Sequence, residues 1–559
     1  MPIRTRAPRL RLHALAITLL ALEAAPAAAA PPANADADTY LHAARPGDTL
    51  IGIAKRLLAH PGDWRAIARI NRMSDPDVLP TGGQLRIPLD LLASNATPVD
   101  VVETVGDARL RRVNGADQPL ARDAILGEGD RIDTGADGYV TLRLADGSLL
   151  RLQAESSAEI ARARSYTATD TVAASLRLLR GRVEAVVTRL RGGQPHFDVR
   201  TPQATLAVRG TEFRVSTGAE THGEVVHGVV GVGAQGGTAA ATNLNAGFGT
   251  VVDASRHVAA PIALLPAPDA SALPALFERK LLRISVPPLA GATGWRMQIA
   301  SDAAFGNVAR EAIAAAPDFR IVDLPDGDWH LRVRAIGERG LEGLDAVHAF
   351  RVHAEPEPPL TIAPAPDAKL RAHGIDFRWT ANPAAVAGYR FQLAAADNAN
   401  FSAAIDDRRL TDTALTLPEL PAGRYRWRVA SLRAPDDAGP WGDAIGVSLL
   451  PPPATATPEV GDDSVRFAWT GEPGQHYDFQ LGRDATFAAP EVVAQLDLPR
   501  LELPRPRPAG RLFMRYRAID PDGFIGPWTA PQTLDVPVCL ESAAGACWRS
   551  GAGGVLLTS

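Results

Sequence analysis

The sequence is poor in cysteine: only Cys539 and Cys547 occur among its 559 residues, and both lie near the C-terminus. Two cysteines cannot supply the four ligands of a structural zinc site, and no histidine lies near them in the sequence. In an oxidising compartment they could form a disulfide across their short loop. We therefore expect no metal site, and at most one disulfide that staples the C-terminal tail.

The sequence also lacks a cluster of lysine and arginine residues. Its formal net charge is −5, and its 58 basic residues are scattered among 63 acidic ones. A nucleic-acid-binding protein usually gathers its basic residues on one face or along one helix. The scattered pattern is typical of solvated strand faces, and we expect no nucleic-acid partner.

Motifs of common catalytic and cofactor sites are missing as well. There is no Gly-x-Ser-x-Gly elbow, no Gly-Lys-Ser/Thr phosphate loop and no His-Glu-x-x-His pair. Gly231-x-Gly233-x-x-Gly236 matches a dinucleotide fingerprint by its letters, but no amphipathic helix follows, so we expect these glycines to form turns. His222 and His227 lack a third ligand at a metal-binding spacing, and we interpret them as surface residues. We predict no catalytic residue, no metal and no cofactor.

The longest apolar run lies at the N-terminus. Four arginines precede an apolar segment over residues 14–22: Arg4, Arg6, Arg9 and Arg11. This order is typical of a secretory signal peptide, and the run is shorter than the roughly 20 residues that span a bilayer. We predict a signal peptide over residues 1–30, a Pro/Ala-rich linker over 31–39, and a mature chain with no transmembrane segment.

Proline (46 residues) and glycine (49 residues) are frequent, and long helical patterns are rare. Short alternating runs between such turn formers are typical of β structure. Domains usually contain about 100–200 residues, so a chain of this length predicts several of them. We therefore expect a mainly β, multidomain protein.

Residues 40–90 have the predicted order strand, helix, helix, strand. Apolar residues at helical spacing follow a Pro-Gly-Asp turn, and Asp48 or Thr49 can cap the first helix. A Pro-Gly pair ends this helix, and Asp63 can cap a second helix that ends near Ile70. So short a segment with this order predicts a small βααβ domain with a thin core.

This segment resembles the LysM family over its whole length. The resemblance is carried by Pro46-Gly47-Asp48-Thr49-Leu50, Ile53-Ala54, Ile70-Asn71, Asp75-Pro76-Asp77 and Leu79-Pro80-Thr81-Gly82-Gly83-Gln84-Leu85-Arg86-Ile87-Pro88. It departs from the family at Gly83, which we expect to loosen the turn. The resemblance implies a peptidoglycan-binding module that grips N-acetylglucosamine-containing glycan with backbone N–H and C=O groups of two facing turns.

The resemblance places the glycan site on the turn after the first strand and on the segment before the last strand. The candidate glycan-binding residues are Gly47, Asp48, Thr49, Leu50, Asn71, Pro76, Asp77, Leu79 and Pro80. A structural alternative is that Asp48 caps a helix and that Leu50 and Leu79 are core residues. Turn chemistry alone would also select most of these residue types.

From residue 101 onward, after a predicted linker over 91–100, the pattern changes to short alternating strands. Two of them flank Asp146-Gly147, a strong hairpin signal. Further strands are expected at Leu176–Leu179, Val183–Val187, Phe197–Val199, Ala204–Val208, Phe213–Val215 and Val225–Val232. Residues 101–255 are thus predicted to form a β-sandwich or a rolled sheet.

This region resembles the FecR domain. Its most specific blocks are Phe197–Pro202 and Val208–Val215, with further matches at Ala145–Ser148 and Leu178–Val183. The resemblance implies contact with another envelope protein. FecR proteins that act as regulators carry a cytoplasmic segment and a transmembrane helix before this domain, whereas here an export signal takes their place. We therefore expect periplasmic sensing or docking instead of direct control of a sigma factor.

The C-terminal half contains three internal repeats. Similar blocks centre on Gln298, Gln392 and Gln480, and each leads to a Pro-x-Gly turn and an aromatic-rich strand. The spacing of about 90 residues fits β-sandwich domains of about 100 residues. The repeats resemble fibronectin type III domains, expected at residues 268–355, 356–453 and 454–540, with a tail over 541–559.

Five tryptophans of the repeats allow a second interpretation: Trp379, Trp427, Trp441, Trp469 and Trp528. Exposed aromatic rings could serve as platforms for sugars. Their recurrence at matched repeat positions favours core or edge positions of β-sandwiches instead.

Together these features predict a non-enzymatic, periplasmic protein associated with the cell wall. The LysM-like module tethers it to peptidoglycan, the FecR-like domain senses or docks a partner, and the repeats act as a spacer or a second interface; signalling and scaffolding are not separated. One alternative is a wall- or polysaccharide-processing enzyme, which would release muropeptides from peptidoglycan. Another is a secreted adhesin, which cell fractionation would reveal by its release into the medium.

Overall fold

The computed structural model describes residues 39–73, 75, 79–169, 171–188, 196–208, 210–237, 241–538, 540–541, 547–550 and 556–558. The chain divides into two units: unit 1 comprises residues 1–274, 283–320 and 328–350, and unit 2 comprises residues 275–282, 321–327 and 351–559. The predicted signal peptide, residues 31–38 of its linker, Pro76, Asp77, Cys539 and the side chain of Cys547 lie outside the described residues, and Thr39, the last residue of the predicted linker, begins β1. No helix in the described ranges is long and apolar enough to cross a bilayer.

The N-terminal module confirms the predicted order strand, helix, helix, strand. Its elements are β1 (Thr39–Ala43), α1 (Leu50–Leu57), the 3₁₀ turn η1 (Pro61–Asp63), α2 (Trp64–Ile70), β2 (Gln84–Pro88) and the 3₁₀ turn η2 (Leu89–Leu91). β1 and β2 pair antiparallel. Thr49 caps α1, because its hydroxyl accepts a hydrogen bond from the Gly52 N–H at 3.1 Å. The side chain of Asp63 forms no such bond at the start of α2.

The thin core of the module is completed by the domain that follows. Its buried residues are Leu50, Ile53, Ala54, Leu57, Leu58, Ile67, Leu85, Ile87, Leu89 and Leu92. Tyr166 and Ala173 of the next domain pack into the same cluster, and each is 1% exposed. A small domain buries little apolar surface by itself, so this shared packing stabilises the module.

Residues 91–100, predicted as a linker, are structured, so that prediction is wrong. η2 ends at Leu91, β3 (Asn95–Ala96) pairs antiparallel with β11 (Ser157–Tyr166), and β4 (Val99–Val105) begins shortly afterwards. Asp90 also forms an ion pair with Arg162 at 3.1 Å. The backbone of this stretch is held by pairing with a strand far along the chain, which the short segment by itself does not reveal.

The central domain is a closed sheet of strands β3 to β20. Of the two predicted alternatives, a sandwich and a rolled sheet, the structure therefore shows the rolled sheet. Its further strands are β5 (Ala108–Arg111), β6 (Asp117–Pro119), β7 (Ile125–Leu126), β8 (Arg131–Thr134), β9 (Tyr139–Arg143), β10 (Leu149–Leu152), β12 (Thr171–Val186), β13 (His196–Arg200), β14 (Ala204–Val208), β15 (Glu212–Thr217), β16 (Thr221–His227), β17 (Val229–Ala234), β18 (Thr242–Asn245), β19 (Phe248–Val252) and β20 (Ile262–Ala263), with the 3₁₀ turn η3 (Thr167–Thr169) between β11 and β12. Inward-facing Val, Leu, Ile and Phe side chains fill the domain with one apolar core.

Two strand assignments from the sequence need correction. The predicted strands 176–179 and 183–187 belong to one long strand, β12, which bends at Gly181 with φ +85° and continues. The predicted strand 225–232 is divided at Gly228, with φ +89°, into β16 and β17. Glycine tolerates positive φ, so it allows a bend within a strand as readily as a turn between strands.

The glycine fingerprint and the two histidines are also placed by the structure. Gly231 and Gly233 lie within β17, where we expected turns, and Gly236 alone lies in a turn, with φ +70°. His222 is partly buried on β16, and His227 is exposed and bonds to Glu212 at 2.9 Å. Within the described residues no group of three or more His, Cys, Asp or Glu side chains could hold a metal ion.

The C-terminal half consists of three β-sandwich repeats with matching sheets. Repeat 1 contains β21 (Leu276–Phe277), β22 (Leu282–Ser285), β23 (Ala292–Ala300), β24 (Val308–Ala314), β25 (Asp318–Ile321), β26 (Gly327–Gly337) and β27 (Ala346–Val352). Repeat 2 contains β28 (Thr361–Ala363), β29 (Ala368–Arg371), β30 (Ile375–Trp379), β31 (Gly388–Ala395), β32 (Asp406–Leu410), β33 (Ala414–Leu417), β34 (Gly423–Ala434), β35 (Asp437–Trp441) and β36 (Ile445–Leu450). Repeat 3 contains β37 (Thr457–Val460), β38 (Ser464–Ala468), β39 (His476–Gly482), β40 (Val492–Leu496), β41 (Arg500–Pro504), β42 (Gly510–Ile519) and β43 (Gln532–Val536), and it is followed by β44 (Leu540–Glu541), β45 (Cys547–Ser550) and β46 (Leu556–Thr558).

The larger sheets share one strand order: β27-β26-β23-β24, β36-β34-β31-β32 and β43-β42-β39-β40. Trp379, Trp427 and Trp469 are buried in the repeat cores. Trp441 and Trp528 are half-buried and stack against Arg428 and Arg515. The first three positions match the predicted core role, whereas Trp441, at the end of β35, and Trp528, outside the strands, stay partly exposed.

Candidate glycan-binding site

Two turns of the module meet beside the end of β1. The Ala44 N–H donates to the Gly83 carbonyl at 2.9 Å, and the Gly82 N–H donates to the Ala44 carbonyl at 2.8 Å. These bonds bring the segment 45–49 next to the segment 79–83. Gly47 and Gly82 have φ of +82° and +83°, a conformation that favours glycine, so both turns depend on these residues.

The surface of the two turns is open. Pro46, Gly47 and Thr49 are exposed on the first turn, and Pro80 to Gly82 are exposed on the second. Backbone groups on such turns are the atoms that can pair with the amide and hydroxyl groups of an acetylated sugar. The structure therefore leaves accessible the two turns on which the predicted groove depends.

Asp48 lies beneath the first turn, and its side chain is only 6% exposed. Its carboxylate accepts hydrogen bonds from the Arg45 N–H at 2.9 Å and from the Arg56 guanidinium at 2.7 Å, and it lies 3.3 Å from Nε2 of His42. The Arg45 N–H and Arg56 hold the pKa of Asp48 well below its usual range, since they outweigh the effect of burial. Asp48 thus ties β1, the turn and α1 together, and Thr49, not Asp48, provides the helix cap.

Three further candidates are held by internal contacts. Leu50 is fully buried, and Leu79 packs at the edge of the module core. The Asn71 side chain donates to the Ile67 and Arg86 carbonyls at 2.8 and 2.9 Å and accepts the Arg86 N–H at 2.8 Å. These residues fix the shape of the two segments, so any contact with glycan from Leu50 would have to come from its backbone.

Gly83 tightens the second turn, contrary to our expectation that it loosens it. Its N–H donates to the Pro80 carbonyl at 2.9 Å, and a Cβ at this position would come within 2.9 Å of the same oxygen. Thr81 and Gly82 are equally exposed parts of this turn that the sequence-based choice of residues omitted. The Thr-Gly-Gly turn signal in the sequence could have identified them.

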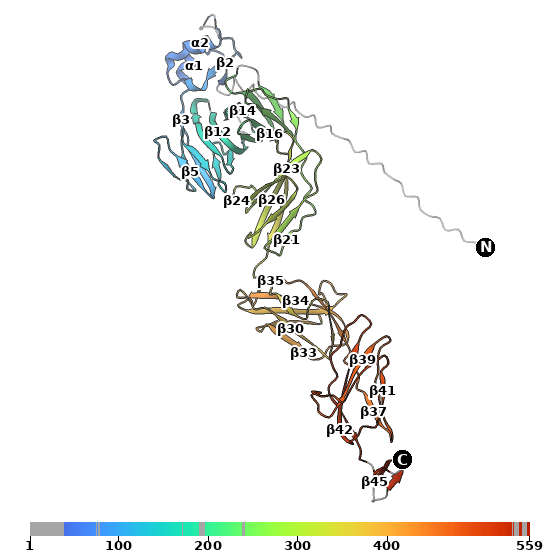
Figure 1. Ribbon diagram of the computed structural model, residues 1–559. Coiled ribbons are helices and arrows are strands. Elements are labelled where there is room, and N and C mark those ends of the chain that lie inside the picture. Colours follow the sequence, from blue (N-terminus) through green and yellow to red (C-terminus); the bar gives the residue numbers. More distant parts are fainter. Residues whose placement is uncertain are drawn as a thin grey trace, which may run out of the picture. The chain divides into compact units, whose positions relative to one another are not determined.

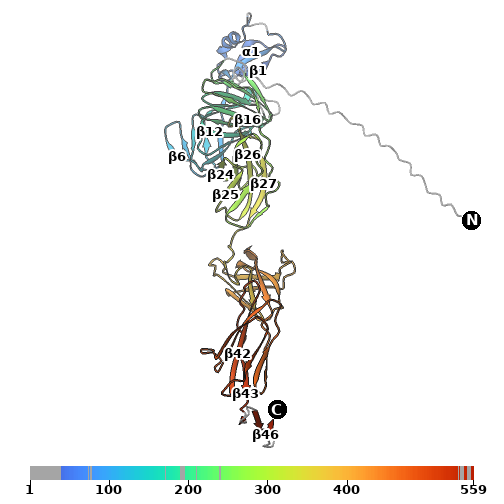
Figure 2. The same ribbon diagram turned by 45° about the vertical axis from the view of Figure 1, so that its right-hand side comes forward.

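The module is fixed to the central domain on the side where Tyr166 packs. In both Figure 1 and Figure 2, α1 of the module lies directly above β12 and β16 of the central domain. Tyr166 lies in a cluster with the module's own leucines and isoleucines, Asp90 pairs with Arg162, and β3 leads without a break into the closed sheet. The module and the central domain are therefore packed as neighbours within unit 1.

We expect Tyr166→Ala to destabilise the module by about 3 kcal/mol, because truncating a buried aromatic side chain leaves a cavity in a core that has few other contacts. Urea unfolding of the full chain measures the effect. Val113→Ala, at a side chain that is 72% exposed, is the control and should change the stability by less than about 0.5 kcal/mol. Equal stability of the two variants would show that Tyr166 does not support the module.

On its other side, the central domain is joined to repeat 1 by buried charges. Glu184 of β12 forms ion pairs with Arg332 at 3.0 Å and with Arg334 at 2.6 Å, both on β26. Arg214 of β15 donates to the carbonyl oxygens of Glu342 and Gly343 at 2.9 and 2.8 Å. Both views of the molecule show β24 and β26 next to the central domain (Figures 1 and 2).

Repeat 1 contributes its own acids to this cluster. Arg296 of β23 pairs with Glu342 at 2.7 Å and with Glu311 at 2.8 Å, and Glu311 also accepts the Tyr139 hydroxyl at 2.9 Å. Burial opposes the ionisation of Glu184, but Arg332 and Arg334 outweigh it and hold the pKa of Glu184 well below its ordinary value. We refer to these side chains as the interdomain charge cluster.

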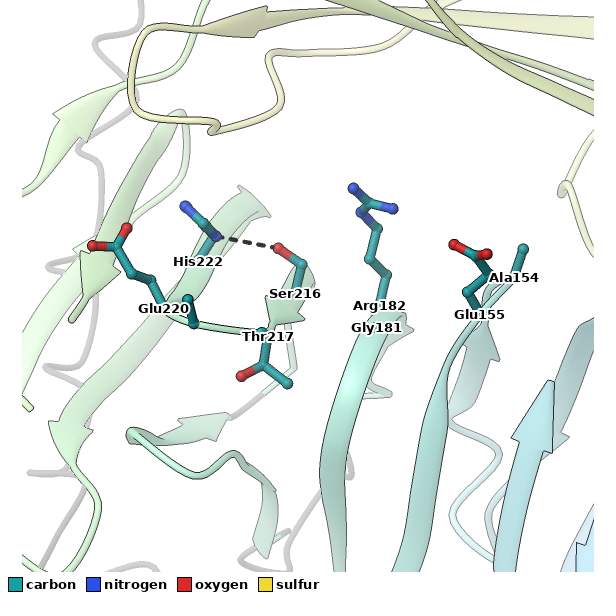
Figure 3. A pocket seen from close by; sticks show the side chains of 10 residues that line it. Ala154, Glu155, Gly181, Arg182, Ser216, Thr217, Glu220 and His222 are labelled. Carbon is teal, nitrogen blue, oxygen red and sulfur yellow. Dashed lines mark hydrogen bonds between the residues drawn. The ribbon is translucent and has the colours of Figure 1, made fainter. Parts of the chain in front are cut away.

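A hollow of about 480 Å³ lies beside this cluster, on the central domain. Its polar lining includes Glu155, Arg182, Ser216, Glu220 and His222 (Figure 3). Nδ1 of His222 lies 3.5 Å from the Ser216 hydroxyl, and burial lowers the pKa of His222. In Figure 3 the Glu220 carboxylate points away from the His222 ring, so the three side chains do not align as a nucleophile with its base and an orienting acid.

Comparisons with known proteins identify two of the domains. The LysM domain family matches residues 42–88, and the FecR protein family matches residues 130–231. No curated protein matches the chain. Two crystal structures of a "putative anti-sigma factor" from Parabacteroides distasonis ATCC 8503 share 21% and 20% identity with this chain, and each match covers 24% of this chain and 59% of that chain with a TM-score of 0.20.

The chain thus spans about 59% of the length of the anti-sigma factor that it matches. The chicken CNTN1 FN1–FN3 domains share 13% identity, over 46% of this chain and 95% of that chain, with a TM-score of 0.18. LysM and FecR are families of binding and regulatory domains, and both indicate the cell envelope. The chain therefore contains a LysM domain and a FecR domain, followed by β-sandwich repeats.

Proposed function

We propose that this protein is a non-enzymatic scaffold or signalling component of the periplasm that holds peptidoglycan with its LysM domain and docks another envelope protein with its FecR domain. The periplasmic location rests on the export signal predicted over residues 1–30. The glycan site comprises the exposed groups of Gly47, Thr49 and Pro80, with Leu79 at its edge. Asp48, Leu50 and Asn71 shape the site from beneath, and Pro76 and Asp77 complete the predicted set.

The observation that carries this proposal is the accessibility of the two turns. Pro46, Gly47, Thr49 and Pro80 stay exposed although the module packs closely onto the central domain through Tyr166. An acetylated sugar needs backbone donors and acceptors together with small apolar contacts, and glycine- and proline-rich turns offer both. The module therefore packs onto the central domain in a way that leaves the two turns of the proposed glycan site accessible.

The contacts that attach the module to the central domain also support a role as a scaffold. Tyr166 and the ion pair of Asp90 with Arg162 fix the module, while Glu184 and Arg334 join the central domain to repeat 1. A force applied to the glycan would therefore be transmitted directly to the FecR domain. The sheet face around Glu184 is already occupied by repeat 1, which leaves the hollow around Arg182 and Glu220 as an open polar surface for docking.

The glycan site is tested with a soluble hexamer of N-acetylglucosamine and two matched variants of the full chain. Pro80→Asp places a carboxylate on the second turn, where sugar binding would have to desolvate it, and we expect about ten-fold weaker binding, or about 1.4 kcal/mol. Pro61→Asp changes another exposed proline of the module, at the start of η1, and should stay within two-fold of wild type. Isothermal titration calorimetry measures both; equal affinities would place the glycan elsewhere.

A further inference from the structure

Repeats 1 and 2 carry the same set of side chains on the same sheet face. In repeat 1 the set is Arg296, Gln298, Phe305, Glu311 and Arg332; in repeat 2 it is Arg390, Gln392, Phe401, Asp407 and Arg428. The strand pairing places Gln298 opposite Glu311 and Arg332, and it places Gln392 opposite Asp407 and Arg428. The two sets are therefore equivalent by register.

Their contacts are equivalent as well. The glutamine amide donates to the acid at 2.6 Å in repeat 1 and at 2.8 Å in repeat 2. The second arginine donates to the glutamine oxygen in both repeats and stacks on the phenylalanine, at 4.4 Å for Arg332 over Phe305 and at 4.1 Å for Arg428 over Phe401. Both phenylalanines also share a left-handed backbone, with φ of +54° and +58°.

What covers this set differs between the two repeats. In repeat 1 it lies under the central domain, and Glu184 supplies the carboxylate that pairs with Arg332. The side chains of Arg296 and Arg332 are 1% and 8% exposed there. This face thus binds a strand, β12, that presents a carboxylate, Glu184, to it.

In repeat 2 the set is partly open. The side chains of Arg390 and Asp407 are 39% and 33% exposed. No carboxylate within the described residues forms an ion pair with Arg428, which lies between the rings of Phe401 and Trp441, at 4.1 and 4.3 Å. Burial and the neighbouring charge of Arg390 lower the pKa of Arg428, so its charge is incompletely balanced, although Glu278 and Asp407 act on it from a distance.

We propose that this face of repeat 2, formed by Arg390, Gln392, Phe401, Asp407, Arg428 and Trp441, is a docking surface for a carboxylate-bearing β-strand of a protein partner. The partner chemistry follows from repeat 1, where the equivalent face holds Glu184 on the strand β12. Arginine between two aromatic rings is pre-organised, so it loses little freedom when it pairs with a carboxylate.

Repeat 3 shows that the set is not required by the sandwich itself. Its Gln480 and Arg515 are retained, but Val493 occupies the position of the acid and Asp478 the position of Arg390. Asp478 pairs with Arg517 at 2.8 Å and reduces the positive charge of that face. Repeat 3 thus keeps an arginine between two rings, with Arg515 at 4.3 Å from Phe487 and 4.6 Å from Trp528, but it lacks the counterparts of Arg390 and Asp407 that complete the face in repeat 2.

The test uses the full chain and a fluorescein-labelled peptide of five alternating Glu-Thr pairs, which presents its carboxylates on one side of an extended strand. Fluorescence anisotropy at low salt should show saturable binding, and a peptide of Gln-Thr pairs should not bind. Arg428→Gln should weaken binding about ten-fold. Arg378→Gln, at an exposed arginine on β30 in the other sheet of repeat 2, is the matched control and should stay within two-fold.

Arg390→Gln serves as a second variant and should also weaken binding, and thermal unfolding of each variant checks that the repeat still folds. The proposal fails if the wild-type chain does not bind the Glu-Thr peptide. It also fails if Arg378→Gln weakens binding as much as Arg428→Gln, because the attraction would then be a general charge effect. Tighter, Arg428-dependent binding of polyglucuronate would assign the face to an acidic polysaccharide and overturn the assignment to a protein.

Discussion

Replacing Arg334 by methionine should destabilise unit 1 by about 3–5 kcal/mol, the cost typical of removing one partner of a buried ion pair. Arg334 is 2% exposed and pairs with Glu184 at 2.6 Å and with Glu342 at 2.7 Å, and it also contacts Asp345. Its loss removes one arginine partner from each of Glu184, Glu342 and Asp345, which keep Arg332, Arg296 and Arg214 to balance their charges where water has little access. Methionine keeps the packing of the side-chain stem, so the change isolates the charge.

Urea unfolding followed by fluorescence and circular dichroism measures this loss. Arg283→Met, at an exposed arginine on β22 of the same repeat, is the control and should stay within about 0.5 kcal/mol of wild type. We also expect the Arg334 variant to unfold in more than one step, because the contact between the central domain and repeat 1 would be weakened, with Arg332, Arg214 and Tyr139 left to hold it. A single transition at the wild-type midpoint would contradict the role given to the interdomain charge cluster.

Glu342 of this cluster and the neighbouring Glu224, which lies 3.6 Å from Arg214, should respond to substitution with opposite signs. Burial, reinforced by Glu342 and opposed by Arg214, raises the pKa of Glu224 to about 7. In the unfolded chain a glutamate ionises near pH 4.3, so Glu224 contributes stability that is present below this value and is lost as the pH rises through about 7. Glu224→Gln should therefore change little at pH 5 and stabilise the protein by about 2 kcal/mol at pH 8.

Glu342 behaves in the opposite way. Burial disfavours its charge, but Arg296 and Arg334 prevail and hold the pKa of Glu342 well below the usual range. Its contribution is present above the unfolded value of about 4.3 and is lost as the pH falls below it. Glu342→Gln should cost about 3 kcal/mol at pH 8. Unfolding curves at pH 5 and pH 8 test both variants. If both variants were less stable than wild type at pH 8, Glu224 could not be the neutral glutamate and Glu342 the charged one.

The sequence predicted the N-terminal module well because its signals are local. Helical periodicity after Thr49, the Pro-Gly break and the closing strand at 84–88 all act over a few residues, and the structure shows these elements. The three repeats were equally visible, since matched glutamines and turns recur along the chain. The β class of the central domain followed from alternating strands, although Gly181 bends a strand that its neighbours made look like two.

What the sequence could not show depends on distant contacts. Arg332 and Arg334 alternate along a strand in the manner of solvated residues, and Glu184, their partner, lies 148 residues before Arg332. Likewise Tyr166 gives no local sign that it completes the core of another domain. Asp48 and Asn71 fit a glycan site and a structural role equally well by residue type, and only their hydrogen bonds reveal how they shape the turns.

In the function proposed above, the open edge of the LysM domain holds the cell wall. The most direct measurement is co-sedimentation of the full chain with purified peptidoglycan sacculi over a range of protein concentrations. We expect saturable binding that an excess of soluble N-acetylglucosamine hexamer displaces and that Pro80→Asp weakens about ten-fold. Binding that neither the hexamer nor the Pro80 variant reduces, or no binding at all, would contradict the account.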